Sequence, residues 1–459
     1  MPPRTPFAWF RRAGRRRAPL PDWPSLAAFG PRPEGGVVVG GAVRDALLGR
    51  PFQDVDWLVD DPERAAHDVA ARLGGRPFAL DAERGHWRLV ADGRVVDLIR
   101  LDGSLDEDLA RRDFTIDAMA LTSEGPVDPL DGRADLTKRR LVRAGPTSLG
   151  DDVLRGLRGV RLAATLDLSW DEATRQDAAR AVREALDGLR PLPAAERMRD
   201  ELTALLSAPR PGDALADAHA LGWLEALLPE LIAGDGMEQG GLHHLDVLQH
   251  QLEALQRLAT GFPDADLALR LATLLHDVGK PACRERGEDG RLRFHGHAER
   301  GAETTLAALR RLRYPEAVVR RAAELVRRHM LPLPRDDREA RRFAHRRRDL
   351  LPDLLQLMVA DREAARGRLS SDATRRAYRT ALARVLAILA EPAQPAPLLD
   401  GRAVMRELGL PPGPEVGRAL AFLAEARAVG DVRDEDEARA ALHRFATAQG
   451  WTLPDVDAS

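Results

Sequence analysis

Short apolar runs separated by turn residues dominate the first third of the chain. Val37–Val39 precedes Gly40-Gly41 and an amphipathic stretch from Ala42 to Leu48, which predicts a strand, a tight turn and a helix. Three more strands are predicted at residues 55–59, 88–90 and 95–99. This region therefore has the pattern of a small α/β domain.

From about Leu149 onward, apolar residues recur at spacings of three and four, as Leu154 and Leu157 do, which predicts amphipathic helices. Prolines separate the successive helical segments. The chain is rich in Ala, Arg and Leu and only 4% aromatic, a composition that favours helices. We therefore expect an α+β fold, in which a small α/β head is followed by an all-α remainder.

The length of 459 residues is too great for one compact core, so several domains are expected. Composition shifts and proline-rich stretches divide the chain into a basic disordered arm, a head, a helical neck and body, a histidine-rich helical domain and a helical tail. Their predicted bounds are residues 1–30, 31–148, 149–240, 241–370 and 371–459.

Composition limits the setting of the protein. Cys283 is the only cysteine, which excludes an intramolecular disulfide or a cysteine-clustered zinc site and fits the reducing cytoplasm. No apolar run approaches the roughly 20 residues that span a bilayer. The net charge is −3, so contacts with nucleic acid must come from local patches. The arginine-rich start, which no signal-like apolar stretch follows, is either such a patch or a solvated tail.

Two carboxylates mark the predicted strand that begins near Asp54. Because side chains alternate along a strand, Asp54 and Asp56 lie on one face, where they can hold Mg²⁺ for phosphoryl or nucleotidyl transfer. An isolated Asp-x-Asp is weak evidence, but Gly40, Gly41 and Arg44 stand upstream at a strand-to-helix turn, a favourable place for phosphate.

Three ordered motifs, GGAVRD at 40–45, DVDW at 54–57 and RRDFTIDAMA at 111–120, resemble the tRNA nucleotidyltransferase and bacterial poly(A) polymerase family. The resemblance implies a polymerase-β-like head. In it, Asp54 and Asp56 bind catalytic Mg²⁺ and the residues at 40, 41 and 44 cradle the triphosphate.

The same resemblance implies that Arg112 and Asp113 contact the nucleotide, with Asp113 accepting from a ribose hydroxyl. Asp97, on a neighbouring predicted strand, is either a third catalytic carboxylate or an exposed ion-pair partner. Asp117 stands where the family usually has Asn, which adds a negative charge near the nucleotide.

Residues 151–161 resemble the family's Glu-Asp-x-x-Arg helix, with Asp replacing Glu at 151. Asp152 and Arg155, three apart, are expected to share a helical face and to imitate a base edge in place of a template. The alternative is a surface ion pair. Arg158 and Arg161 continue this stripe toward phosphate, and residues 196–201 resemble the next helical motif of the family.

Seven of the twelve histidines lie between His243 and His329. His276-Asp277, with His250 before it and Asp361 after it, has the order and helical setting of an HD-type metal phosphohydrolase. These four residues would bind one divalent metal that activates water. The remaining candidates, which would contact phosphate or support the ligands, are His295, His297 and His329. The alternative is a packing domain whose histidines are satisfied by hydrogen bonds.

The predicted activity is template-independent transfer of nucleotides from CTP or ATP to the 3′ end of tRNA. Family members that add the full CCA usually carry a longer segment where residues 100–110 lie, so CC addition alone becomes an option. A-adding and poly(A) activity stay open. A different class of answer is an HD phosphohydrolase with a vestigial RNA-binding head.

Overall fold

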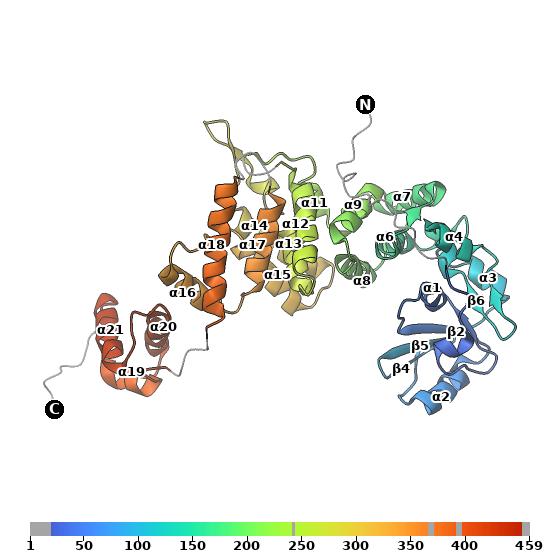
Figure 1. Ribbon diagram of the computed structural model, residues 1–459, viewed down its shortest axis with the longest axis horizontal. Helices are drawn as coiled ribbons and strands as arrows, with labels where there is room; N and C mark the ends of the chain where they lie inside the picture. Colours follow the sequence, from blue (N-terminus) through green and yellow to red (C-terminus); the bar gives the residue numbers. More distant parts are fainter. Residues whose placement is uncertain (1–19, 241–243, 366–370, 392–396, 452–459) are drawn as a thin grey trace. The chain divides into compact units, whose positions relative to one another are not determined.

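The computed structural model describes residues 20–240, 244–365, 371–391 and 397–451 (Figure 1). The chain forms two compact units, the first made of Met1–Ala233 with Ala307–Glu316 and the second of Gly234–Leu306 with Ala317–Ser459. None of the described helices has the length and apolarity needed to cross a membrane.

A seven-stranded mixed sheet forms the head. Its strand order is β3-β4-β5-β2-β1-β6-β7, and β2 and β5 are its parallel pair. Its elements are β1 Val37–Val39, α1 Gly41–Leu47, β2 Asp54–Val59, α2 Pro62–Leu73, β3 Phe78–Asp81, β4 His86–Ala91, β5 Arg94–Arg100, α3 Leu105–Ala110, β6 Ala120–Leu121 and β7 Pro126–Val127.

The two faces of this sheet differ because β2 alternates in character. Val55, Trp57 and Val59 are buried on one face, which α2 covers. Leu58 lies on the other face, in an apolar cluster with Leu109 of α3. Asp54 and Asp56 share that second face, which is apolar near α3 and polar beyond it.

The segment before the head corrects one expectation. Residues 1–19 of the predicted basic arm lie outside the described residues, but Leu26–Phe29 form a short 3₁₀ helix, η2. Phe29 is buried and its ring stacks on Phe52 at 5.3 Å between centroids. The end of the predicted arm is therefore part of the folded head, because an aromatic side chain there reaches the core.

Helices make up most of the remainder of the first unit. A two-stranded parallel pair, β8 with β9, lies among them, so the prediction that everything after the first third is all-α was too simple. The elements are α4 Gly132–Lys138, β8 Arg140–Leu141, α5 Ser148–Asp151, α6 Leu154–Leu166, β9 Ser169–Trp170, α7 Glu172–Leu186, α8 Ala195–Leu206, α9 Pro211–Leu221, α10 Trp223–Leu227 and α11 Pro229–Ile232.

The described residues of the second unit are helical except for one small hairpin, β10 Glu285–Arg286 with β11 Leu292–Arg293. Helices α12, α13 and α17 pack together as its centre. Its helices are α12 Val247–Gly261, α13 Leu267–Leu275, α14 His297–Arg311 (whose last residues belong to the first unit), α15 Glu316–Arg328, α16 Asp337–Arg346, α17 Asp353–Ala364, α18 Asp372–Leu389, α19 Gly401–Leu408, α20 Pro414–Ala428 and α21 Glu435–Ala448.

Candidate active sites

Three carboxylates stand together on the open face of the head sheet. Asp56 of β2 is paired in register with Asp97 of the adjacent parallel strand β5, and Asp54 is two residues before Asp56. Paired residues project to the same face. Burial raises the pKa of Asp56, and the negative charges of Asp97 and Asp54 add to this, although Arg112 opposes it. A bound cation would relieve this crowding of negative charge.

Asp97 already has a cation beside it. Arg88 of β4 donates to both of its carboxylate oxygens, with Nε–Oδ1 and Nη2–Oδ2 distances of 2.7 Å. His86 Nε2 lies 3.5 Å from Asp97 Oδ2. Asp97 is therefore an ion-pair partner that is largely buried rather than exposed, and its position beside Asp56 leaves a catalytic role as a prediction.

The turn between β1 and α1 approaches the carboxylates closely. Gly40 has a φ of 79°, and a Cβ there would lie 2.7 Å from Arg112 Nη1 and 3.4 Å from Asp56 Oδ2. The positive φ favours glycine at this position, and the absence of a side chain leaves room for Arg112. The turn thus brings together Gly40, Asp56 and Arg112, and Arg112 itself pairs with Asp108 at 3.3 Å.

Arg44 does not reach into the open face as a free cation. Its guanidinium is buried and donates to Asp45 at 3.0 Å and to Asp117. Burial raises the pKa of Asp117 to about 6, against the opposing charge of Arg44. Asp117, at a position where the family usually has Asn, therefore forms a buried ion pair with Arg44, the residue predicted to bind the triphosphate.

A charged network joins the head to α6. The buried carboxylate of Asp113 accepts from Arg158 Nη1 at 3.0 Å. Glu201 of α8 accepts from Arg158 Nε at 3.4 Å and from Arg161 Nε at 2.8 Å. The predicted phosphate-facing arginines are therefore engaged by carboxylates that sequence reasoning assigned to other roles.

Asp152 and Arg155 correct a prediction. Asp152 has extended backbone between α5 and α6, so the two residues do not share a helical face. Asp152 instead accepts from Arg197 at 2.6 Å, and Arg155 donates to the Ser148 carbonyl at 3.0 Å. The helix begins later than predicted because Asp152 Oδ1 accepts from the backbone N–H of Leu154, at the start of α6.

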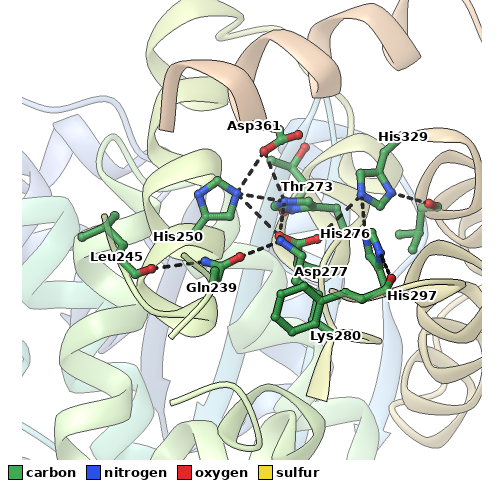
Figure 2. Close-up of polar contacts among 12 residues, drawn as sticks. Gln239, Leu245, His250, Thr273, His276, Asp277, Lys280, His297, His329 and Asp361 are labelled. Atoms are coloured by element: carbon green, nitrogen blue, oxygen red, sulfur yellow. Dashed lines mark hydrogen bonds and ion pairs between the residues drawn. The ribbon is translucent and has the colours of Figure 1, made fainter. Parts of the chain in front are cut away.

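The second unit holds two adjoining groups of metal-ligand side chains (Figure 2). In the first group, His250 Nε2 lies 3.0 Å from Asp361 Oδ1 and 3.3 Å from His276 Nε2. In the second, His297 Nε2 lies 3.4 Å from both His329 Nε2 and Asp277 Oδ1. The residues predicted to surround one metal therefore fall into two groups, each of which could hold a metal ion.

Asp277 connects these two groups. Its Oδ2 atom lies 3.2 Å from His276 Nε2, whereas Oδ1 faces the second group, 3.7 Å from His329 Nε2. Each carboxylate oxygen thus serves a different set of imidazoles. Such an arrangement suits a carboxylate that bridges two divalent metals.

Three backbone carbonyls orient the imidazole rings. The Nδ1 atoms of His276, His297 and His329 lie 2.8, 2.7 and 2.7 Å from the carbonyl oxygens of the residues three positions earlier. A carbonyl can only accept, so each Nδ1 carries the proton and each Nε2 offers its lone pair. Lone pairs that face one another at these distances fit a cation between them.

Sequence reasoning missed two residues here and misplaced a third. Lys280 Nζ donates to Asp277 Oδ2 and to Gln239 Oε1, both at 2.6 Å, and all three residues are buried. Burial alone would raise the pKa of Asp277, but Lys280 and His276 hold it well below its usual range. Lys280 follows His276 by four residues, in the turn after α13, and this closeness in sequence was the available signal. His295 is exposed and lies outside both groups.

A sheet bearing paired aspartates, in one chain with a histidine–aspartate cluster, defines a nucleotidyltransferase joined to an HD domain. Residues 88–142 match the poly A polymerase head domain, 176–234 the probable RNA and SrmB- binding site of polymerase A, and 243–366 the HD domain. The chain belongs to the tRNA nucleotidyltransferase and poly(A) polymerase family, and it is an enzyme of that family.

Two relatives span nearly the whole chain. An A-adding tRNA nucleotidyltransferase of Deinococcus radiodurans is 51% identical over 94% of this chain and 98% of its own length. A CC-adding tRNA nucleotidyltransferase of Thermus thermophilus is 48% identical over 89% and 93%. Among solved structures, the Thermotoga maritima CCA-adding enzyme complexed with tRNA has a TM-score of 0.56 at 19% identity, covering 89% of this chain and 91% of that one. This last likeness shows the fold.

Proposed function

We propose that the chain transfers nucleotides from CTP or ATP to the 3′ end of tRNA without a nucleic-acid template, releasing pyrophosphate. The observation that carries this proposal is the row of Asp54, Asp56 and Asp97 on one open sheet face. The relatives named for A addition and CC addition support the choice of substrate.

In this proposal Asp54 and Asp56 hold Mg²⁺, and Asp97 is the third carboxylate. The metal would neutralise the triphosphate and activate the attacking 3′ hydroxyl. Gly40 and Gly41 let the backbone approach the triphosphate, Arg112 contributes positive charge beside Asp56, and Arg44 maintains the turn through its two carboxylate partners.

Selection of the base is proposed for the start of α6. Asp152 supplies an acceptor and Arg155 a set of donors, each held by its own partner. Asp113 would accept from the ribose hydroxyl, while Arg158 holds it directly and Glu201 links Arg158 to Arg161. The head at 31–148 and the neck and body at 149–240 would then bind the nucleotide and the tRNA.

This proposal is tested with three tRNAs, which lack the 3′-terminal CCA, end in C or end in CC. Each is incubated with CTP and ATP separately, and the products are sequenced. We expect one partial reaction, CC addition or A addition, because only the four residues 101–104 separate β5 from α3, the short helix that leads into Arg111. Growth to full CCA would identify a CCA-adding enzyme, and growth to a long A tail would identify a poly(A) polymerase. No incorporation with any tRNA would overturn the proposal.

The two imidazole–carboxylate groups favour a second activity, metal-dependent phosphohydrolysis at the HD domain, residues 241–370. His250, His276 and Asp361 would hold one metal, His297 and His329 the other, and Asp277 would contact both. A metal pair of this kind supplies activated water for attack on a phosphoester. Hydrolysis of a 2′,3′-cyclic nucleotide tests this activity: one water opens the ring to a 2′- or 3′-phosphomonoester, and a second hydrolysis releases phosphate. Both steps should be lost in His276→Ala, and no hydrolysis with several divalent metals would overturn the proposal.

A further inference from the structure

The row of charged residues on the head sheet continues to an exposed aromatic residue. Phe78 of the edge strand β3 is paired with Arg88, which is paired with Asp97, which in turn is paired with Asp56. Paired residues project to the same face. Phe78 is therefore on the carboxylate face, three strand spacings or about 14 Å from Asp56.

A second exposed apolar residue lies beside this row. Val90 is paired with Val95, which is paired with Asp54, so it too is on the carboxylate face. The exposed fractions are 46% for Phe78 and 51% for Val90. Because Val90 is two residues beyond Arg88, it is the diagonal neighbour of Phe78, at roughly 7–8 Å. The two side chains form one apolar patch next to the catalytic row.

Arg88 adds a positioned cation to this patch. Its Nε and Nη2 atoms donate to Asp97, which holds the guanidinium in place. Its Nη1 atom has no hydrogen-bond partner among the described residues. A guanidinium that is fixed on one side and has donors free on the other is suited to a phosphate oxygen.

We propose that Phe78, Val90 and Arg88 form a platform for the single-stranded 3′ end of the RNA substrate. A base of that end stacks on Phe78 against Val90, a backbone phosphate accepts from Arg88 Nη1, and the 3′ hydroxyl reaches Asp54 and Asp56. Stacking tolerates any base, which suits a terminus whose sequence changes as it grows. This inference rests on the proposed function, since it supplies that reaction with its primer subsite.

Binding of two tRNAs to the full-length protein, without nucleotide, tests the platform. One tRNA is trimmed to its last base pair and the other keeps its single-stranded 3′ residues; each Kd is measured by fluorescence anisotropy. We expect Phe78→Ala to weaken binding of the untrimmed tRNA about tenfold, as loss of one stacked base does, and to leave the trimmed tRNA unchanged. Phe78→Trp, which keeps an aromatic face, should restore the affinity.

Met330→Ala is the matched control, because Met330 is also exposed and apolar but lies in the segment that matches the HD domain, to which no tRNA contact is assigned. Equal weakening of both tRNAs by Phe78→Ala, or no weakening of either, would overturn the platform. A rise in KM for CTP or ATP without a change in tRNA affinity would assign the patch to the incoming nucleotide and overturn it too. Lack of incorporation by the wild type would instead remove the proposed function, since the binding comparison needs no turnover.

Discussion

The head and the HD domain both gather acidic side chains around a place for metal, but they do so to different degrees of completeness. In the HD cluster, ligands from several helices converge, and backbone carbonyls already orient three of the rings. In the head, three aspartates lie on an open sheet face, and Arg88 occupies one of them. The HD side chains already converge as a set of candidate metal ligands, whereas the head presents its three carboxylates on one sheet face with an arginine on one of them.

This difference predicts that nucleotide incorporation at the head is highly sensitive to the loss of a single carboxylate. Replacing Asp54 with Ala should lower the rate of nucleotide incorporation at least about a hundredfold, because the remaining carboxylates cannot fix the metal on the triphosphate. Asp54→Ala should leave phosphate release by the HD domain unchanged. Both rates are measured on the same preparation.

Asp60→Ala is the control for that change, since Asp60 is an exposed aspartate immediately after β2. Incorporation that survived in Asp54→Ala would mean that the head is not the polymerase. The chain would then be an HD phosphohydrolase with an RNA-binding head.

The number of metal ions bound tests whether the two carboxylate oxygens of Asp277 contact two different metals. We expect Asp277→Asn to weaken both metals of the HD cluster, by about a hundredfold, because each group loses a charged ligand. Asp361→Asn should weaken only one, since Asp361 belongs to the first group. Titration with a divalent metal, followed by mass spectrometry of the native protein, gives the count. Equal losses in the two variants would show that the groups do not act as separate sites.

Lys280 sharpens the comparison further, because no lysine stands in the head row. Its ammonium is 2.6 Å from Asp277 Oδ2 and so competes with metal for that oxygen. Lys280→Gln should therefore raise metal affinity about tenfold, measured by competition with a chelator, and lower the Tm of the metal-free protein. Lys138→Gln, at the only other lysine of the chain, is the control. Weaker metal binding in Lys280→Gln would contradict this reading.

The smallest effect concerns the pH dependence of the head. The pKa of Asp117 is raised to about 6, so the folded chain keeps this proton at pH values where the unfolded chain, with a pKa near 3.8, releases it. The stability from the protonated form is complete below about pH 4 and is lost as pH rises through 6.

Asp117→Asn removes this titration. As the pH rises from 5 to 7.5, the free energy of unfolding of the variant should increase by about 1 kcal/mol relative to that of the wild type. The shift in the Tm of the first unit between the two proteins follows this change. Asp102→Asn, at an exposed aspartate of the same domain, should show no such trend. A pH-independent difference for Asp117→Asn would contradict the raised pKa.

Local pattern predicted the head well. The alternation in β2 placed Asp54 and Asp56 on one face, and the structure has them so. The partner of Asp97 was within reach too, because the two-residue turn at Asp92-Gly93 fixes the register that sets Arg88 opposite Asp97. What the pattern could not supply was tertiary: Asp117 lies 73 positions from Arg44, and nothing local indicates their pairing.

The HD cluster also shows that local sequence pattern does not indicate tertiary grouping. Local order picked out six residues that the structure brings together, but it also included the exposed His295 and did not divide the six between two groups. That division depends on how α12, α13 and α17 pack, since His250, His276 and Asp361 come from or border three different helices. The error at Asp152 was different, because its extended backbone, with its side chain accepting from the Leu154 N–H, starts α6 two residues later.

Lys280 has a consequence for how this enzyme matures. An acidic, imidazole-rich pocket usually needs its metal as the partner that lets it close. Here the chain carries its own counter-ion, so we expect the HD domain to finish folding on synthesis and to acquire metal afterwards, by exchange. Its occupancy would then follow the supply of metal in the cell, while the polymerase in the same chain stays folded and ready whether or not that supply is adequate.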